Sequence, residues 1–119
     1  MYGLPHTFDA SFLKGKEITS ICFAAYQVNL YLEADVRIQI EGRYQLLCGD
    51  ELVEAVSTFP VARSSLPQMI GRQIVDVSFS STTGDIEMLM ESGLRLRIDG
   101  DHGPYESYRL FDGIKETIV

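Results

Sequence analysis

The stretch Val36-Arg37-Ile38-Gln39-Ile40-Glu41-Gly42 returns 58 residues later as Leu94-Arg95-Leu96-Arg97-Ile98-Asp99-Gly100. Apolar, basic, acidic and glycine positions follow the same order in both copies. The residues upstream match as well: Gly15, Ile18, Ile21 and Phe23 correspond to Gly71, Ile74, Val77 and Phe79 at an offset of 56, and Val28, Leu30 and Leu32 correspond to Ile86, Met88 and Met90 at an offset of 58. This repetition predicts two similar halves packed as one body.

Each half begins with three segments in which apolar and polar residues alternate, as in strands with one face on a core and one in water. In both halves a two-residue turn, Ala34-Asp35 or Ser92-Gly93, separates the second segment from the third. The sequence therefore predicts a mainly β, antiparallel fold in which a duplicated three-strand meander forms one β-sandwich or half-open barrel. The predicted core residues are Ile21, Phe23, Val28, Leu30, Ile38, Ile40, Val77, Phe79, Ile86, Met88, Leu96 and Ile98.

A single domain over residues 1–119 is expected, with internal repeats at about 13–57 and 69–119, because neither half is large enough to stand alone. The linker between the two halves, residues 59–71, breaks the alternation of apolar and polar residues. There Ser65 can cap a helical turn that has Pro67 near its start and Gly71 at its end. At most one short helix is predicted.

The composition suggests a globular cytoplasmic protein. Hydrophobic residues make up 45% of the 119 positions, and no run resembles a secretory signal or a membrane span. Cys22 and Cys48 lie in apolar strand patterns without metal-ligand spacing, which predicts buried or half-buried reduced thiols, with a disulfide as the alternative.

Seventeen acidic residues against ten basic ones give a net charge of −7. This charge repels phosphate backbones and anionic lipid, so neither nucleic acid nor a membrane is an expected partner. A basic protein would be attracted. The alternative is that the charge only keeps the protein in solution.

The sequence contains no recognised catalytic motif, and no enzyme activity, cofactor or metal is predicted. His6 and His102 are the only histidines. His102 lies in Asp99-Gly100-Asp101-His102-Gly103-Pro104, which suits either a solvated turn or, as the alternative, a divalent cation site. Arg37, Arg95 and Arg97 fall on outward strand positions, where they predict an ion-paired sheet face or, alternatively, a site for phosphate or carboxylate.

Two acidic clusters are candidate partner-binding surfaces. The first contains Asp50, Glu51 and Glu54, and the second contains Asp99, Asp101 and Glu106. The second is favoured, because Tyr105 and Tyr108 can add an aromatic anchor to its charges. The alternative for these tyrosines is that one packs in the core and the other covers a sheet edge.

The glycine turn before the meander, the linker end Met69-Ile70-Gly71 and the closing Tyr105-Glu106-Ser107-Tyr108 resemble a family of small uncharacterised bacterial β-rich domains. Such domains are similar in size and acidity to immunity proteins, which neutralise a toxin. The resemblance spans roughly Leu13 to Val119. It implies a cytoplasmic bacterial immunity protein whose partner is a basic toxin domain, with a non-catalytic ligand-binding or assembly module as the alternative.

Overall fold

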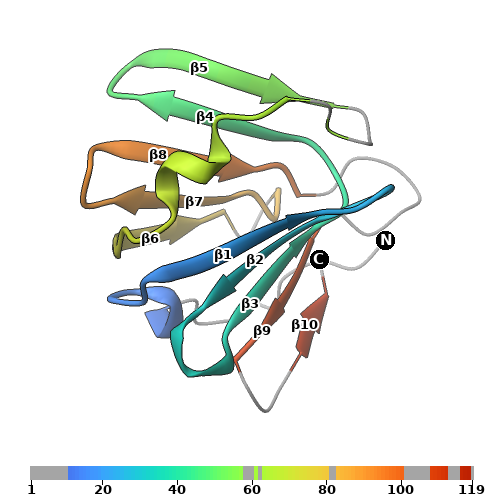
Figure 1. Ribbon diagram of the computed structural model, residues 1–119, viewed down its shortest axis with the longest axis vertical. Coiled ribbons are helices and arrows are strands. Elements are labelled where there is room, and N and C mark those ends of the chain that lie inside the picture. Colours follow the sequence, from blue (N-terminus) through green and yellow to red (C-terminus); the bar gives the residue numbers. More distant parts are fainter. Residues whose placement is uncertain are drawn as a thin grey trace.

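The computed structural model describes residues 11–57, 61, 63–80, 83–100 and 108–112, together with the backbone of 116–118. Ten strands form two five-stranded antiparallel sheets that face each other (Figure 1). The first sheet has the order β1-β2-β3-β9-β10 and the second has the order β5-β4-β8-β7-β6. The predicted fold class is confirmed.

The strands follow the predicted alternation closely. In chain order they are β1 (Ile18–Phe23), β2 (Val28–Leu32), β3 (Arg37–Ile40), β4 (Tyr44–Cys48), β5 (Glu51–Val56), β6 (Ile74–Phe79), β7 (Ile86–Met90), β8 (Leu94–Ile98), β9 (Tyr108–Phe111) and β10 (Glu116–Ile118). Three single 3-10 turns accompany them: η1 (Ser11–Leu13), η2 (Glu33–Asp35) and η3 (Leu66–Met69). Within the described residues, no helix is long and apolar enough to cross a membrane.

The helical turn predicted in the linker is η3, but its start differs from the expectation. Ser65 makes no side-chain capping bond. Instead Ser64 Oγ accepts a hydrogen bond from the Leu66 amide at 3.0 Å, and the Ser65 amide donates to Glu54 at 2.7 Å. The described residues contain no α-helix, only these three 3-10 turns, which agrees with the prediction of at most one short helix.

Corresponding residues of the two halves pair in the same register. Ile18 is opposite Leu32, and Phe23 is opposite Val28; Ile74 is opposite Met90, and Phe79 is opposite Ile86. Both strand pairs are irregular at the same place, one residue after the first isoleucine. The two meanders therefore share their strand-pairing pattern.

The halves meet through reciprocal backbone hydrogen bonds. Gly15 N donates to Ile74 O at 2.6 Å, and the equivalent Gly71 N donates to Ile18 O at 2.7 Å. Both glycines have a left-handed backbone, with φ of 86° and 84°. A side chain is rarely tolerated in that conformation, which explains why glycine occupies both turns.

The last two strands of each half are exchanged. After β3, the chain crosses to the second sheet, where β4 pairs with β8, and β9 crosses in turn to pair with β3 in the first sheet. Tyr44 is thus opposite Ile98, and Tyr108 is opposite Ile40, with all four side chains fully buried. Each sheet consequently contains strands from both halves.

The core lies between the two sheets. Eight of the twelve residues predicted to be buried are buried: Val28, Leu30, Ile38, Ile40, Ile86, Met88, Leu96 and Ile98. Of the other four, which lie on the edge strands β1 and β6, Ile21, Val77 and Phe79 are partly buried and pack against the core. The prediction was wrong for Phe23, which is 38% exposed. An edge strand has a neighbour on one side only, so its inward residues are less completely covered.

Candidate functional site

The first predicted acidic cluster lies at the turn between β4 and β5. Gly49 turns the chain with φ of 63°, and Asp50 projects fully into solvent. Arg95 on the neighbouring β8 fixes the base of the turn, because its Nη2 donates to Gly49 O at 2.5 Å and lies 3.9 Å from Asp50 Oδ1. The turn is therefore held in place while the carboxylates of Asp50 and Glu51 stay exposed.

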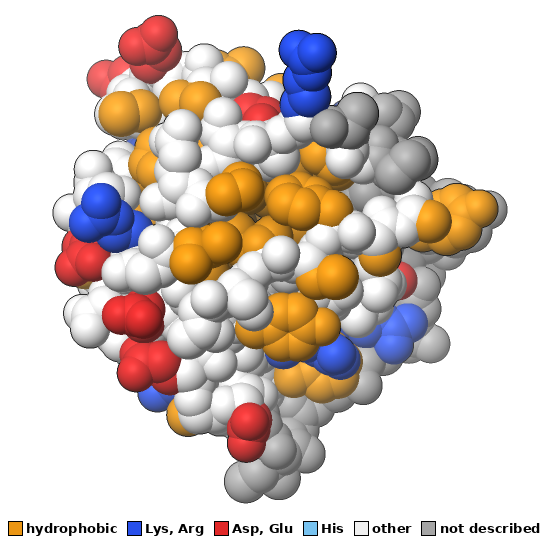
Figure 2. All heavy atoms as spheres, viewed as in Figure 1, with side chains coloured by type: hydrophobic (Ala, Val, Ile, Leu, Met, Phe, Trp, Pro, Cys, Tyr) orange, Lys and Arg blue, Asp and Glu red, His pale blue; other side chains and the backbone are white. Residues whose placement is uncertain are grey.

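Two aliphatic side chains follow the acidic turn. Leu52 is 52% exposed and Val53 is 43% exposed, and the β4–β5 pairing is irregular between Leu46 and Leu47, opposite them. In Figure 2, acidic and hydrophobic side chains stand together at the upper left, where Figure 1 shows the β4–β5 turn. We call Asp50, Glu51, Leu52 and Val53 the hairpin patch.

Glu54 belongs to the predicted cluster but faces another part of the protein. Its carboxylate accepts hydrogen bonds from Ser64 Oγ and from the Ser65 amide, both at 2.7 Å, and from Tyr44 Oη at 3.4 Å. Burial raises the pKa of Tyr44 to about 12, so its phenol stays protonated and can donate. Glu54 thus ties β5 to the segment before η3 and is not an open contact residue.

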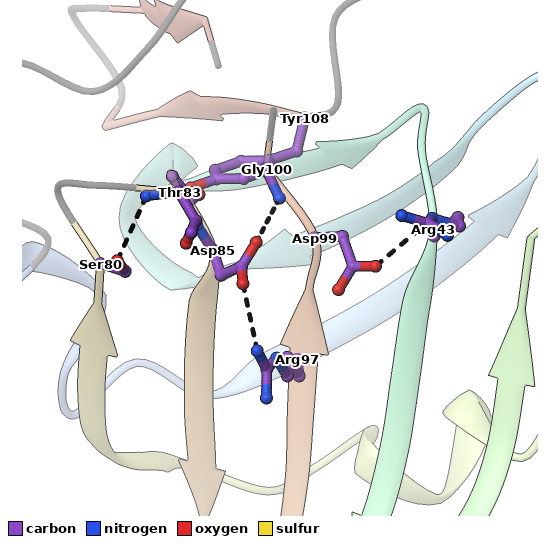
Figure 3. A network of polar contacts seen from close by, with 9 residues as sticks. Arg43, Ser80, Thr83, Asp85, Arg97, Asp99, Gly100 and Tyr108 are labelled. Atoms are coloured by element: carbon purple, nitrogen blue, oxygen red, sulfur yellow. Dashed lines mark hydrogen bonds and ion pairs between the residues drawn. The ribbon is translucent and has the colours of Figure 1, made fainter. Parts of the chain in front are cut away.

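The second predicted cluster is only partly within the described structure. Asp101, Tyr105 and Glu106 lie outside the described residues. Asp99 lies 3.4 Å from the Arg43 guanidinium, with 21% of its side chain exposed (Figure 3).

The assignment of Tyr108 to an aromatic anchor was wrong. It is fully buried, and its hydroxyl donates to Gly84 O at 2.6 Å. Burial, and to a smaller degree the charge of Asp85, raise the pKa of Tyr108 above its usual value of 10.0. The protonated phenol is therefore part of the core and is not available to contact a partner.

Asp85 organises the turn above Tyr108. Figure 3 shows its carboxylate between the Gly100 amide, at 2.7 Å, and the Arg97 guanidinium, at 3.1 Å. Burial alone would raise the pKa of Asp85, but these two donors, with Thr83, outweigh burial and lower that pKa below 3.8. The ionised carboxylate therefore stabilises the folded state.

Replacing Asp85 with asparagine is expected to lower the free energy of unfolding by about 1.5–3 kcal/mol at pH 7, since charge-assisted hydrogen bonds are lost. A carboxyl group with a lowered pKa stabilises the fold above its unfolded pKa and loses that effect as the pH falls through its folded value. The difference between wild type and Asp85→Asn should accordingly be constant from pH 5 to 7 and shrink below about pH 4. Urea unfolding at several pH values measures this difference in stability. A difference that persists at pH 2 would contradict a stabilising role for the ionised Asp85 carboxylate.

Arg95 and Arg97 lie on an ion-paired face of the second sheet, as predicted: Arg95 pairs with Glu87 at 3.1 Å and Arg97 with Asp85 at 3.1 Å. Arg37 differs from the prediction, because it lies on β3 in the first sheet and stacks on the Phe111 ring at 3.9 Å. Beside β6, β7 and β8 there is an open groove of about 420 Å³. It is lined by Ser78, Phe79, Ser80, Thr83, Asp85, Ile86, Glu87 and Arg97.

Both cysteines are free, and both are exposed. The expected burial of these thiols was wrong, because Cys22 lies on the outward side of an edge strand and Cys48 at the end of β4. Over the described ranges, no three His, Cys, Asp or Glu side chains come together as metal ligands. His6 and His102 lie outside those ranges.

Comparisons with protein-family models, with characterised proteins and with solved structures give no match for this chain.

The sequence indicated the acidic half of the hairpin patch but not its apolar half. Leu52 and Val53 are adjacent, and two neighbouring apolar residues interrupt strict alternation. This interruption was the available signal, since one of two consecutive strand residues must face away from the core.

Proposed function

We propose that this protein is a cytoplasmic bacterial immunity protein that binds and neutralises a basic toxin domain, without catalysis, through the hairpin patch. The observation that carries the proposal is the exposure of Asp50 and Glu51 directly beside Leu52 and Val53 at the end of the second sheet. Interfaces combine an apolar centre with a polar rim, and this patch offers both within four residues.

The net charge of −7 supports the choice of a basic partner. Toxins that act on nucleic acids bind phosphates through Lys and Arg, and an acidic surface can occupy the same groups. The cluster around Asp101 and Glu106, with Tyr105, remains a second place for the same contact. The hairpin patch is preferred because Tyr108 is buried and is no longer available as an anchor there.

Charge reversal of the hairpin patch tests the proposal. The double variant Asp50→Lys with Glu51→Lys is expected to weaken partner binding by about tenfold or more, mainly by slowing association, because steering by opposite charge is lost. Wild type and variant are each used to capture partners from the native host, and the captured protein is identified by mass spectrometry and titrated against both.

A matched control has the same change of charge elsewhere. Asp35→Lys with Asp76→Lys alters two exposed acidic residues outside the hairpin patch and should leave most of the affinity intact. Equal loss in both double variants would show that only overall charge matters. Unchanged affinity of the hairpin variant, with a folded protein by circular dichroism, would exclude the patch and direct the test to Asp101→Lys with Glu106→Lys.

The alternative function is a non-catalytic ligand-binding or assembly module, and the groove beside β6, β7 and β8 favours it. Its hydroxyl, carboxylate and guanidinium groups come from Ser78, Ser80, Thr83, Asp85, Glu87 and Arg97. Such a mixed set suits a small polar molecule. Resonance shifts at these residues in a metabolite extract, with no captured protein, would favour this alternative.

A further inference from the structure

β5 is an edge strand of the second sheet, with a partner strand on one side only. β5 pairs only with β4, and no backbone hydrogen bond joins it to any other described residue. In an antiparallel pair, alternate residues direct their N–H and C=O groups away from the partner strand. The outer side of β5 therefore presents backbone donors and acceptors that no described residue pairs with.

The edges at β1 and β6 are different. Ile18 N donates to Arg72 O at 3.0 Å, and Ile74 N donates to Lys16 O at 2.9 Å, so each of these strands is covered at its start by the other half. Among the described residues, β5 is joined to the segment before η3 by the side chain of Glu54, and no described backbone group pairs with the outer side of its first residues. The open part of this edge therefore coincides with the hairpin patch.

The charges beside this edge determine which strand can pair with it. A second copy of this chain carries the same net charge of −7, so long-range repulsion opposes its approach to the acidic start of β5. Acidic residues and an irregular register are also devices that prevent self-association of edges. An extended segment containing Lys or Arg meets no such repulsion and gains attraction instead.

We infer that the partner adds an extended basic segment to the second sheet as a strand along β5, with Leu52 and Val53 contacting its apolar side chains. Main-chain hydrogen bonds then supply affinity, and the carboxylates of Asp50 and Glu51 select for basic residues. This inference rests on the proposed function for the class of partner, and it adds the mode of binding.

The test uses a synthetic peptide of about seven residues in which lysine and valine alternate, the length of a typical strand. Its addition to isotope-labelled protein should shift the amide resonances of β5 and slow hydrogen exchange there by about tenfold or more. The same peptide methylated on alternate backbone nitrogens keeps its charge and side chains but cannot complete the strand pairing. It should lose these effects, as should a peptide with glutamate in place of lysine.

Three results would overturn the inference. Equal binding of the methylated and unmethylated peptides would mean that the hairpin patch attracts basic segments by charge alone, which leaves the proposed function intact. Absence of any change at β5 at millimolar peptide, or a change at another edge, would remove β5 as the docking strand. Concentration-dependent shifts of β5 without peptide would assign the edge to a second copy of the chain.

Discussion

Replacing Gly100 with alanine is expected to lower the free energy of unfolding by about 3 kcal/mol, the upper part of the usual range for an added methyl group in a packed site. A Cβ atom at this position would overlap the backbone of Thr83 and Gly84, lying 2.7 Å from Gly84 Cα. Backbone on the facing side cannot move aside as a flexible side chain can. The hydrogen bond from the Gly100 amide to Asp85 would be displaced with it.

Gly49→Ala is the matched control for this substitution. Gly49 has a left-handed backbone but open space around it, so alanine there meets only the conformational cost of about 1 kcal/mol. Chemical unfolding of both variants measures the difference. If Gly100→Ala costs no more than Gly49→Ala, the close packing of the two turns is not as described.

Truncating a buried side chain on a central strand should lower the free energy of unfolding by a similar amount. Ile38 on β3 lies between Leu30 and Leu110, and Leu96 on β8 lies between Met88 and Leu46, with all six side chains buried. Ile38→Ala and Leu96→Ala should each cost about 2–5 kcal/mol, because each leaves a cavity between strands from both halves.

Phe23→Ala provides the comparison. Phe23 is 38% exposed on an edge strand, so this substitution should lower the free energy of unfolding clearly less than Ile38→Ala or Leu96→Ala, although the phenylalanine side chain is larger. Thermal and urea unfolding of the three variants decide the order. A larger loss of unfolding free energy in Phe23→Ala than in Ile38→Ala would contradict the placement of the core between the central strands.

The sequence predicted the strands well because alternation records which side of a strand is buried. It did not predict where each strand sits within its sheet. Phe23 and Phe79 follow the same alternation as Leu30 and Met88, and only the edge position of β1 and β6 explains why they are less buried. The exchange of β4 with β9 escaped prediction for the same reason, since the pattern in Tyr44–Cys48 is compatible with either neighbour, β3 or β8.

The candidate site was predictable only in its charges. Asp50 and Glu51 are visible as an acidic pair, but the sequence did not show that Glu54, three residues later, would turn to Ser64 and Ser65. Tyr108 looked like an interface residue because tyrosine suits both cores and interfaces. Its partner, Gly84 O, is 24 residues away, and such a long-range contact leaves no local pattern.

The exchanged strands also dictate an order of events during synthesis. The ribosome delivers β1, β2 and β3 early, but the strand that completes their sheet beyond β3 is β9, which begins at Tyr108. Until then the side of β3 that will receive β9 has no native partner, and unpaired edges are where nascent chains aggregate. The first sheet is therefore completed only after the second half has been translated, and a nascent chain that ends before Tyr108 carries an unpaired β3 edge that is prone to aggregation.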